Sequence, residues 1–234
     1  MATSSVANRI ERRDLRRAKR RDALLDAAMS IVEEDGVDGL TVARLAQRAN
    51  AAVGGLYRYF DGKQAVVAGL QHRAAARFGA FQRDRLAACA ARAAGAPDTV
   101  SSLACVWVAF SAWSEFADAE PVLYRLVDNA LSSPVPVLDD ALAIDVEGTV
   151  TTVLDQASAQ IDASVAAGAL VAGDSPLRSL MLWASVHGIG HFRKRDRFMP
   201  EARHASRMQA ALFTACLVGW GASPEAVSAC RTFT

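Results

Sequence analysis

Apolar residues in the first part of the chain recur at the spacing of an amphipathic helix. Leu24, Ala28, Ile31 and Val32 follow one another at i, i+4, i+7 and i+8, which places them on one helix face. Gly36 comes directly after three acids and can adopt the left-handed conformation that ends a helix. Similar helical stretches, separated by short segments with proline or glycine, continue to the end of the chain. The pattern therefore predicts an all-α fold.

Two short helices are predicted after this first one. The hydroxyl of Thr41 suits the N-cap of a helix, and Asn50 interrupts that helix after two turns. Asparagine tolerates the left-handed conformation that a tight turn between helices requires. A third helix is expected over residues 52–60, with three apolar side chains facing inward: Val53, Leu56 and Phe60.

Helices joined in this way and braced by a preceding helix form a helix-turn-helix unit, here at about residues 41–60. The exposed second helix of such a unit fits the major groove of DNA. Gly54 and Gly55 are poor helix formers, but without side chains they let the backbone approach DNA closely. The alternative is that they mark a place where two helices pack tightly. A fourth helix is predicted to start near Lys63.

Charge is distributed unevenly along a chain whose overall net charge is only +1. Residues 1–80 carry 14 Lys or Arg against 9 Asp or Glu, whereas residues 81–234 carry 12 against 16. The first 21 residues alone hold 8 basic and 2 acidic side chains. A basic arm over residues 1–17 ahead of a folded domain indicates nucleic-acid binding. A solubilising tail is the alternative interpretation.

Composition excludes several other classes of protein. Charged residues interrupt every apolar stretch, and no apolar run follows the basic N-terminus, so we expect neither a membrane span nor a secretion signal. The four cysteines lack metal-site spacing and are expected to be small buried side chains in a reducing cytoplasm: Cys89, Cys105, Cys216 and Cys230. The sequence also lacks a Gly-rich phosphate loop and a nucleophile elbow, so we expect neither an enzyme nor a bound cofactor or metal.

The stretch LTVARLAQRANAAVGGLYRYFDGKQAVV resembles the DNA-binding domain of the tetracycline-repressor (TetR) family. The resemblance covers residues 18–78 and depends mainly on the Leu-Tyr-x-x-Phe-x-x-Lys core. It implies that phosphates are held by Thr41, Tyr57, Tyr59 and Lys63, and that bases face the start of the second helix together with Ala52, Val53, Gly54 and Gly55. The chemistry agrees, because hydroxyls and an ammonium group donate hydrogen bonds to phosphate oxygens.

The chain departs from the family pattern at several positions. Asn50 replaces the usual turn glycine, and Ala51 and Ala52 replace valine and serine, so the third helix lacks a side-chain N-cap. Alanine also stands at position 43, where the family often has a polar base contact. Arg44 and Arg58 are then the candidates for reading bases, with DNA shape contributing to recognition.

For residues 79–234 the resemblance implies a helical domain that binds a ligand and forms a dimer. Two stripes with small side chains would allow two helices per subunit to meet their copies closely. These stripes could instead pack within one subunit. The predicted dimer residues are Ala184, Gly188, Met208, Ala211, Leu212, Ala215 and Gly219.

Aromatic residues gather in the same domain and are candidates for lining an apolar ligand cavity. Ordinary core packing is the alternative. The candidates are Trp107, Phe110, Trp113, Phe116, Tyr124, Met181, Trp183 and His187. His187 and His191 are four residues apart, as metal ligands can be, but glycine stands at position 188 where a metalloprotease has glutamate. The basic run at residues 193–197 reads as a solvated loop or, alternatively, a site for an anionic ligand.

Together these patterns predict a cytoplasmic, homodimeric regulator of transcription. An N-terminal three-helix DNA-binding domain would bind a palindromic operator, and a helical ligand-binding and dimerisation domain would release it when a small apolar molecule binds. The regulator is predicted to repress transcription. The alternatives are a DNA-binding protein that needs no ligand and a helical enzyme.

Overall fold

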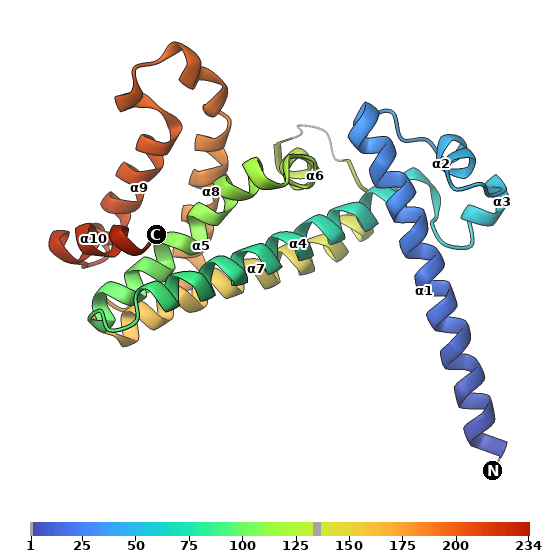
Figure 1. Ribbon diagram of the computed structural model, residues 1–234, viewed down its shortest axis with the longest axis horizontal. Coiled ribbons are helices and arrows are strands. Elements are labelled where there is room, and N and C mark those ends of the chain that lie inside the picture. The colour runs from blue at the N-terminus through green and yellow to red at the C-terminus, as the bar shows by residue number, and fades with distance from the viewer. Residues whose placement is uncertain (1, 133–136) are drawn as a thin grey trace. The chain divides into compact units, whose positions relative to one another are not determined.

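The computed structural model describes residues 2–132 and 137–234, and every regular element in these ranges is a helix (Figure 1). The predicted all-α fold is confirmed. The chain forms two compact units, each of which combines segments that are distant in sequence. Among the described residues, unit 1 contains residues 2–74, 125–132 and 137–146, and unit 2 contains residues 75–124 and 147–234.

Unit 1 is built on α1 (Ala2–Asp35), α2 (Val42–Arg48), α3 (Val53–Leu56) and the first part of α4 (Gly62–Arg92). The predicted stripe on α1 is buried, with Ile31 and Ala28 fully inaccessible to solvent, and Gly36 ends the helix with φ +71°. Gly69 lets α4 lie close to α1, because a Cβ atom there would come within 2.9 Å of Leu25.

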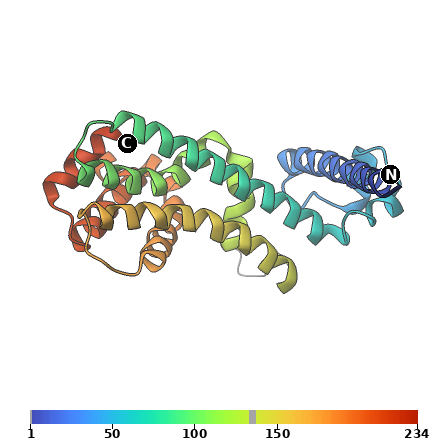
Figure 2. The same ribbon diagram turned by 90° about the horizontal axis from the view of Figure 1, so that it is seen from below.

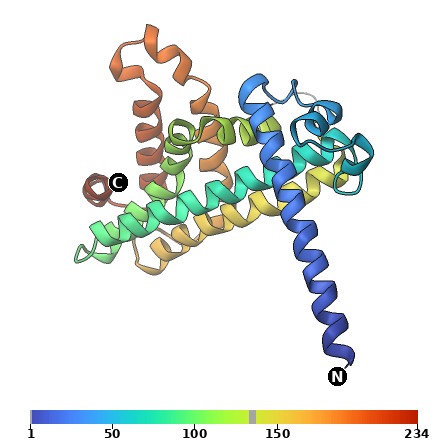
Figure 3. The same ribbon diagram turned by 45° about the vertical axis from the view of Figure 1, so that its right-hand side comes forward.

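Helix α1 runs without a break across the predicted boundary between residues 17 and 18 (Figure 3). The basic arm is therefore part of a 34-residue helix, although Met1 lies outside the described residues.

Unit 1 also includes a segment that the sequence analysis assigned to the second domain. The end of α6 (Pro121–Ser132) and the start of α7 (Asp140–Ala166) belong to it. Gln71 on α4 donates a hydrogen bond to the carbonyl of Leu126, and His72 lies 2.8 Å from the carboxylate of Asp145. These contacts extend the unit beyond the 18–78 boundary because α4 continues well past the helix-turn-helix.

Unit 2 is organised around α5 (Asp98–Ala119), which contacts α8 (Ser175–Gly190) and α10 (Pro224–Cys230). Helix α5 is long and apolar enough to cross a membrane by length and composition, but 61% of its most apolar window is buried inside the unit. Its hydrophobicity is accounted for by the core that it forms, in which Trp113 and Phe116 are fully buried.

The remaining helices of unit 2 cover this core. Helices α8 and α9 (Ala205–Gly219) contact each other and are joined through two short 3-10 helices, η1 (Arg193–Phe198) and η2 (Glu201–Arg203) (Figure 1). A last 3-10 turn, η3 (Arg231–Phe233), follows α10. The later parts of α4 and α7 meet where Gln156 donates a 2.8 Å hydrogen bond to Gln82 (Figure 2).

Candidate nucleic-acid interface

The start and the end of helix α2 are set by the two residues that the sequence predicted for these roles, Thr41 and Asn50. The Thr41 hydroxyl accepts a 3.1 Å hydrogen bond from the backbone N–H of Arg44, as an N-cap does. Leu45 and Ala46 are buried against the rest of unit 1. Asn50 has φ +47°, so the chain reverses through a left-handed residue. The sharp turn of a helix-turn-helix unit is thereby confirmed.

Helix α3 is shorter than predicted, spanning only Val53–Leu56, and residues 57–59 form a turn. Ala52 gives it no side-chain cap, as expected from the missing serine. Leu56 and Phe60 point inward and are at most 5% exposed. The prediction that Val53 also faces inward is wrong, because its side chain is 43% exposed. In so short a helix, one turn cannot place all three apolar residues on the same side.

The outward side of α3 has no side chain at Gly54 and a phenol at Tyr57. A Cβ atom at Gly54 would meet no protein atom within 4 Å, so tight helix packing does not account for this glycine. Gly55 is half-buried, and a Cβ there would lie 3.9 Å from the Arg58 guanidinium. Tyr57 is 56% exposed. Ala52 and Thr41 are also exposed, whereas Tyr59 and Lys63 are half-buried where the chain enters α4.

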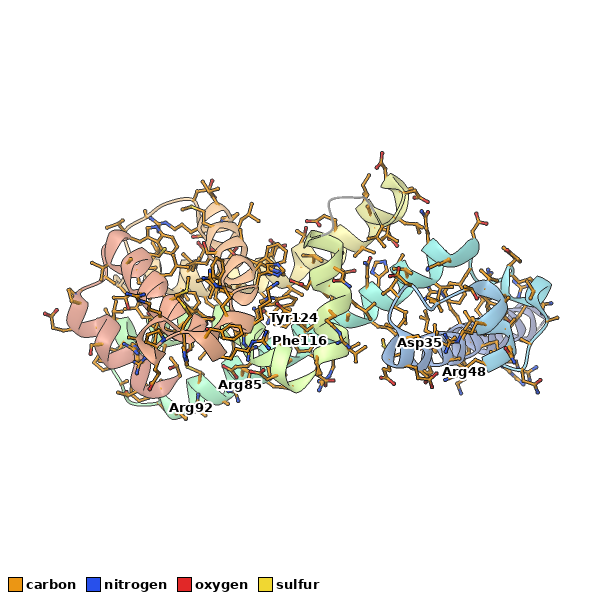
Figure 4. All side chains as sticks on the ribbon, turned by 90° about the horizontal axis from the view of Figure 1, so that it is seen from above. Asp35, Arg48, Arg85, Arg92, Phe116 and Tyr124 are labelled. Atoms are coloured by element: carbon orange, nitrogen blue, oxygen red, sulfur yellow. The ribbon has the colours of Figure 1, made fainter. Side chains whose placement is uncertain are left out.

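Arg44 occupies a different environment from the one expected of a base-reading residue. Its guanidinium forms ion pairs with Glu34 and Asp35 at the end of α1 and donates to the carbonyl of Gly39. Arg48, one turn later, also pairs with Glu34, and this hydrogen bond lowers the pKa of that carboxyl group. Figure 4 labels Asp35 and Arg48 at this junction. Base reading by Arg44 remains a prediction, and in the structure this side chain joins α1 to α2.

Arg58 and Tyr59 line a concave surface that the sequence did not reveal. The cavity, of about 590 Å³, is completed by side chains of α1: Arg13, Asp14, Arg16 and Arg17. Arg17 donates a 3.2 Å hydrogen bond to the carbonyl of Arg58, which links α1 to the turn after α3. Three of the arginines lie at i, i+3 and i+4 and so share one helix face. This spacing would have indicated a basic helix face in the sequence, provided that the N-terminal arm was taken to be helical. We call these six residues the basic concavity.

In unit 2 the aromatic candidates form two clusters. Trp113 is the centre of the first, with ring centroids 4.7 Å from Tyr124, 4.5 Å from His187 and 6.2 Å from Phe116. Trp183 joins it through His187, at 4.4 Å. Figure 4 labels Phe116 and Tyr124 in this unit. In the second cluster, Trp107 and Phe110 pack against Phe213 at 5.2 and 6.4 Å.

The first cluster contains a buried polar group that the surrounding protein does not satisfy. Trp113 is 2% exposed, and its indole nitrogen finds no hydrogen-bond acceptor among the described residues. Met181 does not take part in either cluster, contrary to the sequence prediction, because it is 50% exposed on the outer side of α8. His187 is buried, whereas His191, one turn later at the end of α8, is exposed.

The predicted dimer residues lie on the outward faces of α8 and α9. Ala184, Gly188, Ala211, Ala215 and Gly219 are exposed, Met208 is 38% exposed, and Leu212 is half-buried. Further exposed apolar side chains extend this surface: Leu177, Leu180, Met181 and Val218. The described residues thus present an unburied apolar surface, and the alternative that these stripes pack within one subunit does not account for it.

The structure defines a helix-turn-helix protein with a helical second unit, and comparison with known proteins agrees. Residues 24–70 match the sequence pattern of bacterial regulatory proteins of the tetR family. The HTH-type transcriptional regulator BetI of Burkholderia thailandensis is 35% identical over 125 residues, which cover 49% of this chain and 60% of BetI. The chain therefore matches only about three fifths of the length of this curated relative.

Two solved structures share the fold across most of the chain. A protein with unknown function from Rhodococcus sp. RHA1 has a TM-score of 0.62 at 23% identity, covering 86% of this chain and 95% of that one. The transcriptional regulator FadR from Bacillus subtilis, in complex with stearoyl-CoA, has a TM-score of 0.59 at 16% identity, covering 84% and 97%. The match to the tetR family of bacterial regulatory proteins thus covers residues 24–70, which contain the helix-turn-helix, and the two solved structures show that the rest of the chain shares their fold.

Proposed function

We propose that this protein is a transcriptional regulator that binds double-stranded DNA as a homodimer. The observation that carries the proposal is the construction of the α2–turn–α3 unit. Its apolar side is buried, while its outward side combines the open backbone of Gly54 with hydroxyl groups at Thr41 and Tyr57. Hydroxyls donate to phosphates, and a bare backbone lets α3 approach the groove closely.

The outward faces of α8 and α9 supply the proposed dimer contact. Two such faces related by a two-fold axis would bury the exposed leucine, methionine and small side chains of both copies. A symmetric dimer carries two helix-turn-helix units and therefore reads two half-sites of a palindromic operator.

The proposed effector is a small apolar or aromatic molecule that binds at the Trp113 cluster of unit 2. Such a molecule needs an apolar environment with a few polar groups that fix its orientation. The buried indole N–H of Trp113 would supply one donor. FadR, which shares the fold, is known with bound stearoyl-CoA. Binding of the effector to the arrangement that holds DNA poorly would make the protein a repressor, acting in the cytoplasm.

The test is selection of binding sites from random double-stranded DNA with the full-length protein. We expect a two-fold-symmetric motif, and we expect Gly54→Ala to bind it more weakly although its unfolding free energy is unchanged or raised. The added methyl group meets no protein atom and improves helix propensity by up to about 1 kcal/mol. Ala87→Gly in α4 is a control with the reverse exchange on an exposed helix position. Recovery of no enriched motif, or equal affinity of Gly54→Ala, would contradict the proposal.

A further inference from the structure

The structure brings together two cysteines that are separated in the sequence. Cys89 lies near the end of α4 and Cys105 in the second turn of α5, and their side chains are within hydrogen-bonding contact. Both are free thiols. Cys89 is fully buried and Cys105 is half-buried, so Cys105 is the member of the pair that is partly exposed to solvent.

Charge and burial give the two thiols different properties. The hydrogen bond from Cys89 lowers the pKa of Cys105 below that of an ordinary thiol, and the same interaction, together with burial, raises the pKa of Cys89. Arg92 and Cys230 also act on Cys89, with Arg92 favouring its thiolate and Cys230 opposing it. Figure 4 labels Arg92 at the end of α4. A low-pKa, accessible thiol beside a second thiol is the arrangement found in redox-reactive cysteine pairs.

The remaining cysteines do not share this arrangement. The thiol of Cys230 donates to the carbonyl of Val227 at 3.2 Å, and burial raises its pKa to about 11. Burial also raises the pKa of Cys216 on α9. Cys216 is half-buried like Cys105, so it offers a matched control with similar access and a less reactive thiol.

We propose that Cys105 and Cys89 form a peroxide-reactive dithiol that closes into a disulfide between α4 and α5. The Cys105 thiolate attacks one oxygen of a hydroperoxide: the S–O bond forms, the O–O bond breaks, and the alcohol or water leaves with a proton. Cys105 is then a sulfenic acid. The Cys89 thiol loses its proton and attacks the Cys105 sulfur, so that the S–S bond forms and the S–O bond breaks with release of water. Two thiols are oxidised and one peroxide is reduced.

The consequence for the fold is a covalent link at one end of α4. That helix runs from unit 1 into unit 2, and Gln82 already joins it to α5 through a 2.8 Å hydrogen bond to the carbonyl of Ala109. The disulfide would hold this part of α4 against α5. An effect of this disulfide on operator affinity rests on the proposed function, whereas formation of the disulfide does not. The experiment can therefore contradict the disulfide proposal without contradicting the proposed DNA binding, and the reverse.

The experiment treats the full-length protein with hydrogen peroxide and maps disulfides by mass spectrometry of unreduced digests. We expect one intramolecular Cys89–Cys105 cross-link and loss of two thiols per chain. Cys89→Ser should leave Cys105 as a sulfenic acid that a diketone reagent labels, Cys105→Ser should abolish the cross-link, and Cys216→Ser should behave as wild type. The initial rate should rise with pH as the Cys105 thiol loses its proton, because the thiolate is the reacting form, and the rise should occur at lower pH than for Cys216, whose pKa is raised.

Mapping of the wild-type protein decides the question even if a serine variant does not fold. A predominant cross-link to Cys216 or Cys230, a cross-link only between chains, or sulfenic acid on Cys216 before Cys105 would overturn the proposal. Retention of all four thiols after prolonged exposure would do the same.

Discussion

The basic concavity makes a quantitative prediction about salt. Arg13, Arg16 and Arg17 line it from α1, facing Arg58 and Tyr59. Each phosphate contact to B-DNA contributes about 0.9 to the slope of log affinity against log salt concentration. If the three α1 arginines each contact one phosphate, replacing all three with alanine lowers that slope by about 2.7. The ratio of wild-type to variant affinity should then shrink about 40-fold as salt rises from about 50 to 200 mM.

The assay is fluorescence anisotropy with operator DNA and with an unrelated duplex over that salt range. The triple alanine variant should lose the same factor of affinity on both DNAs, since phosphate contacts do not depend on the base sequence. Alanine keeps the helix propensity of α1, and urea unfolding checks that loss of the Arg17 hydrogen bond has not disturbed unit 1.

A control variant separates local contacts from net charge. Lys194, Arg195 and Arg197 are exposed on η1 in unit 2, so their triple alanine variant removes the same three charges elsewhere. We expect the control to keep the wild-type slope. An unchanged slope in the α1 variant, or equal changes in both variants, would refute phosphate binding in the concavity.

Three further predictions concern single residues. Asn50→Ala should lower the free energy of unfolding by about 1–2 kcal/mol in urea titration, because alanine is strained in the left-handed conformation that this residue adopts at φ +47°. An unchanged free energy of unfolding would mean that the turn adopts another conformation without cost. Phe116→Ala should cost about 3–5 kcal/mol by the same method, since its side chain is fully buried, and a loss below 1 kcal/mol would show a loosely packed core. Trp113→Phe should weaken an aromatic effector with a hydrogen-bond acceptor, measured by calorimetry, while leaving operator affinity unchanged; equal effector affinity would place the ligand elsewhere.

Features of the fold that depend on neighbouring residues could be predicted from the sequence. The N-cap at Thr41, the left-handed turn at Asn50 and the stop at Gly36 each require only a few adjacent residues. The stripe on α1 was equally predictable because it extends over more than two turns. Val53 was misplaced, since a helix of four residues is too short to define a face by periodicity.

Contacts between distant segments could not be predicted in the same way. The meeting of Cys89 with Cys105 depends on how α4 and α5 pack, and no spacing in the sequence encodes it. The basic concavity depends on α1 continuing as a helix through residues that read as a flexible arm. Met181 was assigned to the aromatic cluster by proximity in sequence, but its side chain is 50% exposed whereas that of His187 is buried.

The position of Arg44 follows from the electrostatics of α1 rather than from DNA. Helix α1 ends in three acids, where the helix dipole is also negative, so these carboxylates are unfavourably placed unless cations lie close by. Arg44 and Arg48, one turn apart on α2, supply them by pairing with Glu34 and Asp35. The ion pairs therefore orient α2 on α1. An arginine held in this way must break those pairs before it can read a base, whereas the Arg58 guanidinium already lines an open surface next to α3. Direct readout by arginine is accordingly expected from Arg58, with DNA shape supplying the discrimination that Arg44 does not.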